Sequence, residues 1–124
     1  MDSATRHAIY TATARIVALI GARDGRSLKE EFGMPEPVAE ELFEVLAGYV
    51  DDAPPAISAP PHETAFGAPV RGKIPVDIYA MNAPATWGVD CSLWIDGAPV
   101  EPVLHLRFAN IAGRLTQQHQ NIES

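Results

Sequence analysis

The side chains best suited to chemistry lie in the second half of the chain, in runs that alternate between apolar and polar residues. In the stretch TWGVDCSLWIDG, residues 86–97, an acid and a thiol lie inside such a run. A histidine held by a carboxylate could serve as a general acid or base, and an activated thiol could serve as a nucleophile. Which chemistry is possible depends on the face of the sheet to which each side chain points.

The pair Asp96–Gly97, between two alternating runs, predicts a tight hairpin. With these two residues as the loop, Val89 lies opposite Leu104. A second hairpin with residues 110–113 as its loop then places His119 opposite Leu104. A shift of one residue would mix the two faces, so the agreement of the large apolar residues supports this register. They share one face: Trp87, Val89, Cys91, Leu93, Leu104, Leu106, Phe108 and Leu115.

This register predicts a candidate pocket between the apolar face and the helices. Gln117 and His119 are the strongly polar groups on that face, and an apolar hollow with a few polar groups is typical of small-molecule sites. There His119 would act as acid or base, Gln117 would donate a hydrogen bond and Trp87 would line the wall. If the last strand frays, both polar side chains are instead solvated. Cys91 shares this face without a histidine beside it, so we expect a small buried apolar residue and no nucleophile.

The opposite face carries a second candidate set, Asp90, Trp94, His105 and Arg107. Asp90 lies diagonal to His105, and a carboxylate that holds a histidine has the geometry of acid–base catalysis. An open sheet face does not exclude water, however, and a surface ion pair has the same sequence pattern. Aromatic residues and arginine are enriched at protein interfaces. We therefore expect this face to form the subunit interface of a homodimer.

Sequence motifs for metals and cofactors are absent. The four histidines, His7, His62, His105 and His119, show no metal-ligand spacing, and the chain has a single cysteine. It has no glycine-rich phosphate loop and no other nucleotide or hydrolase motif. We predict no bound metal and no cofactor. The pair His62–Glu63, in a proline-rich segment, is left without an assigned role.

Length and charge restrict the partners. The 124 residues fit one domain, and the formal net charge of −7 with scattered basic residues disfavours nucleic acid and anionic membranes. The helix–Gly–helix pattern of residues 27–47 is that of a DNA-binding motif, but its second helix would bring Glu40, Glu41 and Glu44 to the DNA. No apolar run approaches the roughly 18 residues of a membrane span. With one cysteine and no secretory signal pattern, we expect a cytoplasmic protein.

The elements that position these side chains follow from periodicity. Apolar residues three and four apart predict helices, the first of which stops at Gly21. Ser27 and Glu30 have capping-box spacing, Gly33 ends the second helix, and Pro37 opens the third. Six of eleven prolines fall in residues 53–75, which excludes regular helix there and allows a short edge strand near Thr64 to Phe66. The predicted fold class is α+β, with two to three N-terminal helices packed on a four-stranded antiparallel meander. The expected bounds are helices 4–21, 27–32 and 37–49, the proline-rich crossing 53–75, and strands 74–81, 86–95, 99–109 and 114–122.

Two segments resemble the cone-shaped NTF2-like (SnoaL-like) superfamily. IVALIGARDGRSLKEEF is similar to its first-helix segment, and IAGRLTQQHQNI is similar to its closing hairpin and polar strand. TWGVDCSLWIDG followed by PVLHLRF also resembles a family of small bacterial domains with a W-x-V-x-x-x-L-W strand. The resemblance implies a helix-covered, curved sheet. This chain departs from the enzymatic members because its apolar face carries no catalytic Asp–Tyr or Asp–Arg–Asp set, and a fold alone does not imply a function.

The leading functional hypothesis is a non-catalytic binding or protein-interaction module, since no catalytic constellation is complete. The alternative is a small-molecule isomerase, cyclase or hydrolase with its pocket between helices and sheet. A second alternative is an acidic immunity-type partner of a basic protein, which the net charge and the glutamates of residues 36–44 would suit.

Overall fold

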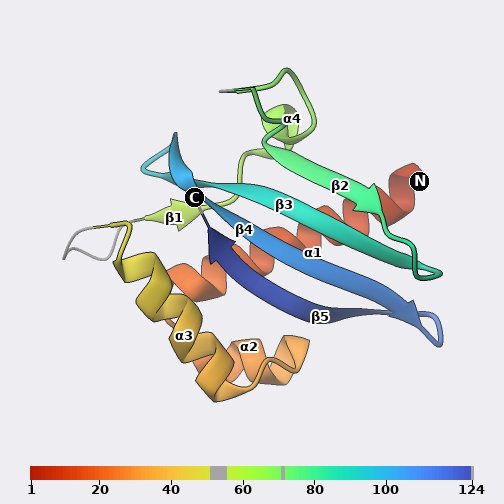
Figure 1. Ribbon diagram of the computed structural model, residues 1–124, viewed down its shortest axis with the longest axis horizontal. Coiled ribbons are helices and arrows are strands. Elements are labelled where there is room, and N and C mark those ends of the chain that lie inside the picture. Colours follow the sequence, from red (N-terminus) through yellow and green to blue (C-terminus); the bar gives the residue numbers. More distant parts are fainter. Residues whose placement is uncertain (51–55, 71, 124) are drawn as a thin grey trace.

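The computed structural model describes residues 1–50, 56–70 and 72–123. The protein is an α+β chain, with its helices in the first half and a curled antiparallel sheet, a half-barrel in outline, in the second (Figure 1). The helices and strands are α1 (Ser3–Gly21), α2 (Gly25–Phe32), α3 (Glu36–Ala47), β1 (Ile57–Ser58), α4 (His62–Ala65), β2 (Val76–Ala80), β3 (Thr86–Ile95), β4 (Ala98–Ile111) and β5 (Arg114–Glu123).

The second helix begins two residues earlier than its predicted start. The capping box expected from Ser27 and Glu30 is wrong, because Asp24 is the N-cap. The Asp24 carboxylate accepts hydrogen bonds from the backbone N–H of Ser27 at 3.0 Å and from its hydroxyl at 2.8 Å. The left-handed Gly33, with φ 68°, ends α2 as predicted, and a proline occupies the first turn of α3 as predicted. Helix α3 ends at Ala47, before the expected residue 49.

The prediction that the prolines of residues 53–75 exclude regular helix is wrong for residues 62–65. A four-residue helix, α4, follows Pro61, which is its N-cap and therefore needs no backbone N–H. This helix replaces the edge strand expected at residues 64–66. The edge strand present here is β1, which pairs with the end of β3 through Ile57 and Ile95. Of the segment predicted as 53–75, residues 53–55 and 71 lie outside the described part.

The sheet is an antiparallel meander of β2, β3, β4 and β5, and β1 shares with β2 the edge of β3 that is not paired with β4. Helix α1 crosses behind the sheet in Figure 1, and α2 and α3 lie beside β5. A continuous hydrophobic core fills the space between these layers. Its fully buried members include Ile9, Ile16, Val17, Leu28, Val89, Cys91 and Leu104, each with 0% exposure.

The β3–β4 and β4–β5 hairpins are two-residue turns with positive φ at both positions. Asp96 and Gly97 have φ of 50° and 79°, and Ala112 and Gly113 have φ of 52° and 79°. These values are those of turns whose twist matches that of paired strands. The first loop was predicted correctly. The second is shorter than the predicted 110–113.

Two irregularities change the predicted register. Between β3 and β4 the pairing moves by two residues, so Val89 pairs with Leu106 and not with Leu104, and the faces stay the same. On β5, Gln117 pairs with Phe108 while His119 pairs with Arg107, which makes Gln118 an unpaired bulge residue. The bulge moves every later residue of β5 to the opposite face. The placement of His119 on the helix-facing side is therefore wrong.

Candidate functional site

The sheet face directed away from the helices, called the outer face below, carries a row of polar residues across four strands. The register aligns Asp77 of β2, Asp90 of β3, His105 of β4 and Asn121 of β5. The next row consists of Tyr79, Gly88, Arg107 and His119.

The segment before β2 covers part of the outer face. Backbone hydrogen bonds in both directions close the turn between Val70 and Lys73, at 2.8 and 3.1 Å. The Ser92 N–H then donates to the Pro75 carbonyl oxygen at 2.8 Å, which fastens the segment to β3. In this way residues of the proline-rich segment, Lys73 and Pro75 among them, become walls of a site on the sheet.

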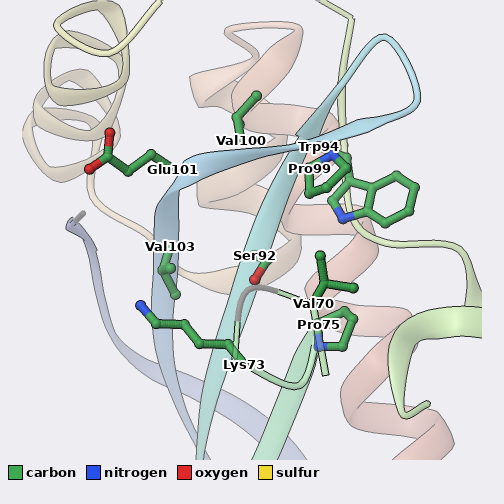
Figure 2. Close-up of a pocket in the computed structure, with 9 residues that line it drawn as sticks. All are labelled: Val70, Lys73, Pro75, Ser92, Trp94, Pro99, Val100, Glu101 and Val103. Carbon is green, nitrogen blue, oxygen red and sulfur yellow. The ribbon is translucent and has the colours of Figure 1, made fainter. Parts of the chain in front are cut away.

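Two adjoining hollows result, and together they are called the outer groove below. The Trp94 hollow has a volume of about 210 Å³ and mostly apolar walls, including Val70, Pro75, Pro99 and Val103 (Figure 2). The His105 hollow, of about 430 Å³, is lined by Asp77, Asp90, His105 and Glu123 among others. Lys73, Ser92 and Val103 line both. The groove is thus apolar at one end and ionisable at the other.

Trp94 brings an unusual polar atom to the apolar end. Its indole Nε1 is buried and has no hydrogen-bond partner in the described part of the chain. A buried donor without an acceptor costs about 1–3 kcal/mol relative to a satisfied one. The Trp94 N–H is therefore a donor that the described part of the chain leaves unsatisfied.

A hydrogen-bonded cluster occupies the ionisable end. Asp90 Oδ1 lies 2.7 Å from His105 Nδ1 and accepts a hydrogen bond from the Tyr79 hydroxyl at 3.2 Å. On the other side of the imidazole, Nε2 lies 3.8 Å from Glu123 Oε2. The pKa of Tyr79 is raised by the partial burial of its side chain, by the negative charge of Asp90 and by the hydrogen bond between the Tyr79 hydroxyl and Asp90. The Tyr79 ring lies over Gly88, where any side chain would overlap it.

This cluster could move a proton. With Nδ1 held by Asp90, the second ring nitrogen of His105, Nε2, faces Glu123 at 3.8 Å without a hydrogen bond to it, and a histidine oriented by a carboxylate in this way has the arrangement of a general base. Ser92 lines the same hollow, but no hydrogen bond joins its hydroxyl to His105 within the described ranges. The groove therefore contains an acid–base pair and no assembled Ser–His–Asp triad.

The four predicted pocket residues do not form a pocket. Cys91 is fully buried in the core and Trp87 packs against it. Burial raises the pKa of the Cys91 thiol to about 12, which keeps it protonated. Gln117 is on the predicted face, but its amide donates to the His119 carbonyl oxygen at 2.6 Å and to Gln120 Oε1 at 2.8 Å. The His119 side chain is exposed on the outer face.

The four predicted interface residues do share the outer face. Asp90 and His105 form the hydrogen-bonded cluster, and Trp94 lines the apolar hollow. Arg107 lies one row further along, and its Nε is buried without a hydrogen-bond partner in the described part of the chain. Grouping them was correct, whereas their role as a subunit interface stays a prediction.

Several residues of the groove escaped the sequence analysis, although some left a signal. Asp77 and Tyr79 alternate with apolar residues of β2, so their face could be read from the period alone. The bulge in β5 left a signal as well. Leu115 and Ile122 are separated by an odd number of positions, so regular alternation would place them on opposite faces of the sheet. Ile122 can be buried on the face of Gln117 only if a bulge lies between Leu115 and Ile122. Lys73 left no signal, because it belongs to a loop.

His62 belongs to a separate aromatic cluster where α4 meets α1. Its ring lies edge-on to Tyr10 at 5.1 Å between centroids, and to His7 at 5.9 Å. The Tyr10 hydroxyl donates to the Pro60 carbonyl oxygen at 2.7 Å. These contacts fasten the proline-rich segment to α1.

Metal-ligand clusters and membrane spans are both missing from the described residues. No three His, Cys, Asp or Glu side chains gather there as they would around a metal ion. None of the described helices has the length and apolar character needed to cross a membrane.

Comparison with known proteins does not assign the chain to a family. No protein-family model, no curated protein and no solved structure matches the chain. The functional argument therefore depends on the geometry of the outer groove.

Proposed function

We propose that the protein is a non-catalytic binding module and that the outer groove is its binding site. The observation that carries the proposal is the Trp94 hollow, where an indole N–H without a partner among the described residues is buried beside apolar walls. A hollow with apolar walls and a few polar groups is the usual form of a ligand site. The His105 hollow, of about 430 Å³, falls within the usual size of such sites, and the smaller Trp94 hollow, of about 210 Å³, adjoins it.

A neutral fluorescent dye, N-phenyl-1-naphthylamine, tests the site. We expect saturable binding of one dye per chain, with enhanced emission from the apolar hollow. Ser92→Phe should abolish it, because Ser92 lies where the two hollows meet. Thr116→Phe is the matched control, a polar-to-phenylalanine change on the outer face of β5, outside both hollows. Binding that Ser92→Phe leaves unchanged would count against the groove.

A second copy of the chain is an alternative occupant of the same face. Tyr79 is 41% exposed, and the partly exposed Arg107 lies in the same row of the outer face, so a protein partner could cover both side chains. Light scattering at high micromolar concentration tests this. A dimer that Trp94→Ala and Arg107→Ala disrupt would favour a protein interface, and a strict monomer would favour a small ligand.

A second candidate function is a small-molecule enzyme with His105 as general base, and the 2.7 Å contact to Asp90 is the observation that favours it. The substrate would occupy the outer groove, not a pocket between helices and sheet. p-Nitrophenyl acetate is a suitable probe, since a positioned imidazole accelerates its hydrolysis. His105→Gln should abolish a saturable rate that His119→Gln, the matched exposed control, leaves intact. Equal losses in the two variants would exclude this role.

The resemblance to NTF2-like cones concerns the fold alone in this proposal. Helices followed by a curled sheet are compatible with such a cone. The proposed binding site is on the other side of the sheet from the helix-covered face.

A further inference from the structure

We infer that the outer groove takes a small molecule in which a positively charged group, an amine or guanidine, is joined to an apolar body. This inference rests on the proposed function and adds the chemical class of the ligand. It follows from the charges at one end of the groove and from the walls at the other.

Among the described residues, carboxylates outnumber basic groups at the ionisable end. Asp77, Asp90 and Glu123 line the His105 hollow, and Lys73 and His105 are the basic side chains that line it with them. His105 is already engaged by Asp90 and lies near Glu123. Glu101 lines the Trp94 hollow, and the chain as a whole has a formal charge of −7. The local and the overall fields both favour a cation.

The strand register creates a like-charge contact that a cation would relieve. Asp77 pairs directly with Asp90 across β2 and β3. Like charges directly opposite each other destabilise a sheet. Asp90 has hydrogen-bond partners in Tyr79 and His105, whereas Asp77 has no hydrogen bond or ion pair to another described side chain. A ligand cation beside Asp77 would therefore supply the missing counter-charge.

The apolar end defines the remainder of the ligand. Trp94, Pro75 and Val70 form walls for a ring or branched chain, and Ser92 projects from β3 between the Lys73 and Trp94 side chains in Figure 2. None of the residues that the structure describes supplies an acceptor for the indole N–H of Trp94. A carbonyl or hydroxyl oxygen on the ligand would accept a hydrogen bond from this N–H. The expected ligand has a positive group, an apolar body and one oxygen acceptor.

Three related probes separate charge from shape. At about pH 6, below the usual pKa of an α-amino group, L-phenylalaninamide is a cation, N-acetyl-L-phenylalaninamide is neutral and N-acetyl-L-phenylalanine is an anion. All three carry the same ring and a carbonyl oxygen. Binding is followed by the ¹⁵N–¹H resonances of the two tryptophan indoles, which Trp94→Phe assigns. We expect the cation to bind most tightly and the anion most weakly, with the shift at Trp94. The preference for the cation should shrink in high salt.

Removing one carboxylate tests the charge directly. Asp77→Asn should weaken phenylalaninamide binding by about fivefold, the effect of about 1 kcal/mol from one partly solvated charge pair. Glu41→Gln, on the exposed surface of α3, changes the net charge equally and should leave the affinity unchanged. Equal or tighter binding of the neutral or anionic probe would overturn the charge inference while leaving the proposed groove in place. Failure of all three probes to shift Trp94 would overturn both.

Discussion

Replacing Leu104 with alanine tests whether the space between helices and sheet is a packed core or a ligand pocket. Leu104 has 0% exposure and lies in the middle of the sheet, with Cys91 and Ile122 as its neighbours in register. The sequence predicted a small-molecule pocket on this face of the sheet. The structure instead fills it with hydrophobic side chains, so a smaller residue leaves a cavity.

The expected loss in the free energy of unfolding follows from the carbon atoms that Leu104→Ala removes. Leucine to alanine removes three carbon groups, worth about 2.4 kcal/mol of transfer free energy at about 0.8 kcal/mol each. The cavity adds to this, and comparable buried leucines cost about 2.7–5 kcal/mol in total. We expect a loss near 3.5 kcal/mol in the free energy of unfolding, which corresponds to a fall of about 2 M in the urea midpoint for an m-value of about 1.5–2 kcal/mol per molar.

Urea denaturation followed by circular dichroism measures this loss. Ile111→Ala, at the 52% exposed end of β4, is the matched control and should change stability by less than about 0.5 kcal/mol. A Leu104→Ala cost below about 1 kcal/mol would refute the reasoning, because it would mean that the side chain borders empty or solvated space.

Three further predictions concern single buried or crowded groups. The Cys91 thiol is fully buried, so Ellman's reagent should label it only as fast as the protein unfolds, and rapid labelling of the native protein would contradict this. Burial raises the pKa of the Cys91 thiol from 9.0 to about 12, so between these values the unfolded chain releases a proton that the folded state keeps. The contribution of the protonated thiol to the free energy of unfolding is therefore intact below pH 9 and is lost as the pH rises towards 12. Cys91→Ala should therefore lose stability less steeply above pH 9 in urea titrations, and parallel curves would show that the thiol does not contribute. Gly88→Ala would push the Tyr79 ring off the strand and away from Asp90, so the raised pKa of Tyr79 should fall towards 10.0 in an absorbance titration, with Tyr79→Phe identifying its signal.

Local patterns in the sequence determined the order of helices α1 to α3 and strands β2 to β5, and the apolar side of the central strands. The Asp96–Gly97 turn forms because both residues adopt the positive φ that a two-residue hairpin requires. Trp87, Cys91 and Phe108 stay on the predicted face although the β3–β4 pairing moved by two residues, because side chains alternate with a period of two. These features depend on residues close together in the chain, and the sequence therefore predicts them.

Contacts between distant parts of the chain determined the bulge in β5 and the outer groove. Gln118 bulges because Ile122 gains burial in the core beside Leu104, and this turns His119 outward. The contacts of Asp90 with His105 and Tyr79 require three strands in one register. Lys73 reaches the groove through a turn that is held to β3 by a backbone hydrogen bond at Pro75. A short-range pattern cannot specify such a site, because the free energy that selects it comes from burial and hydrogen bonds between segments far apart in the sequence.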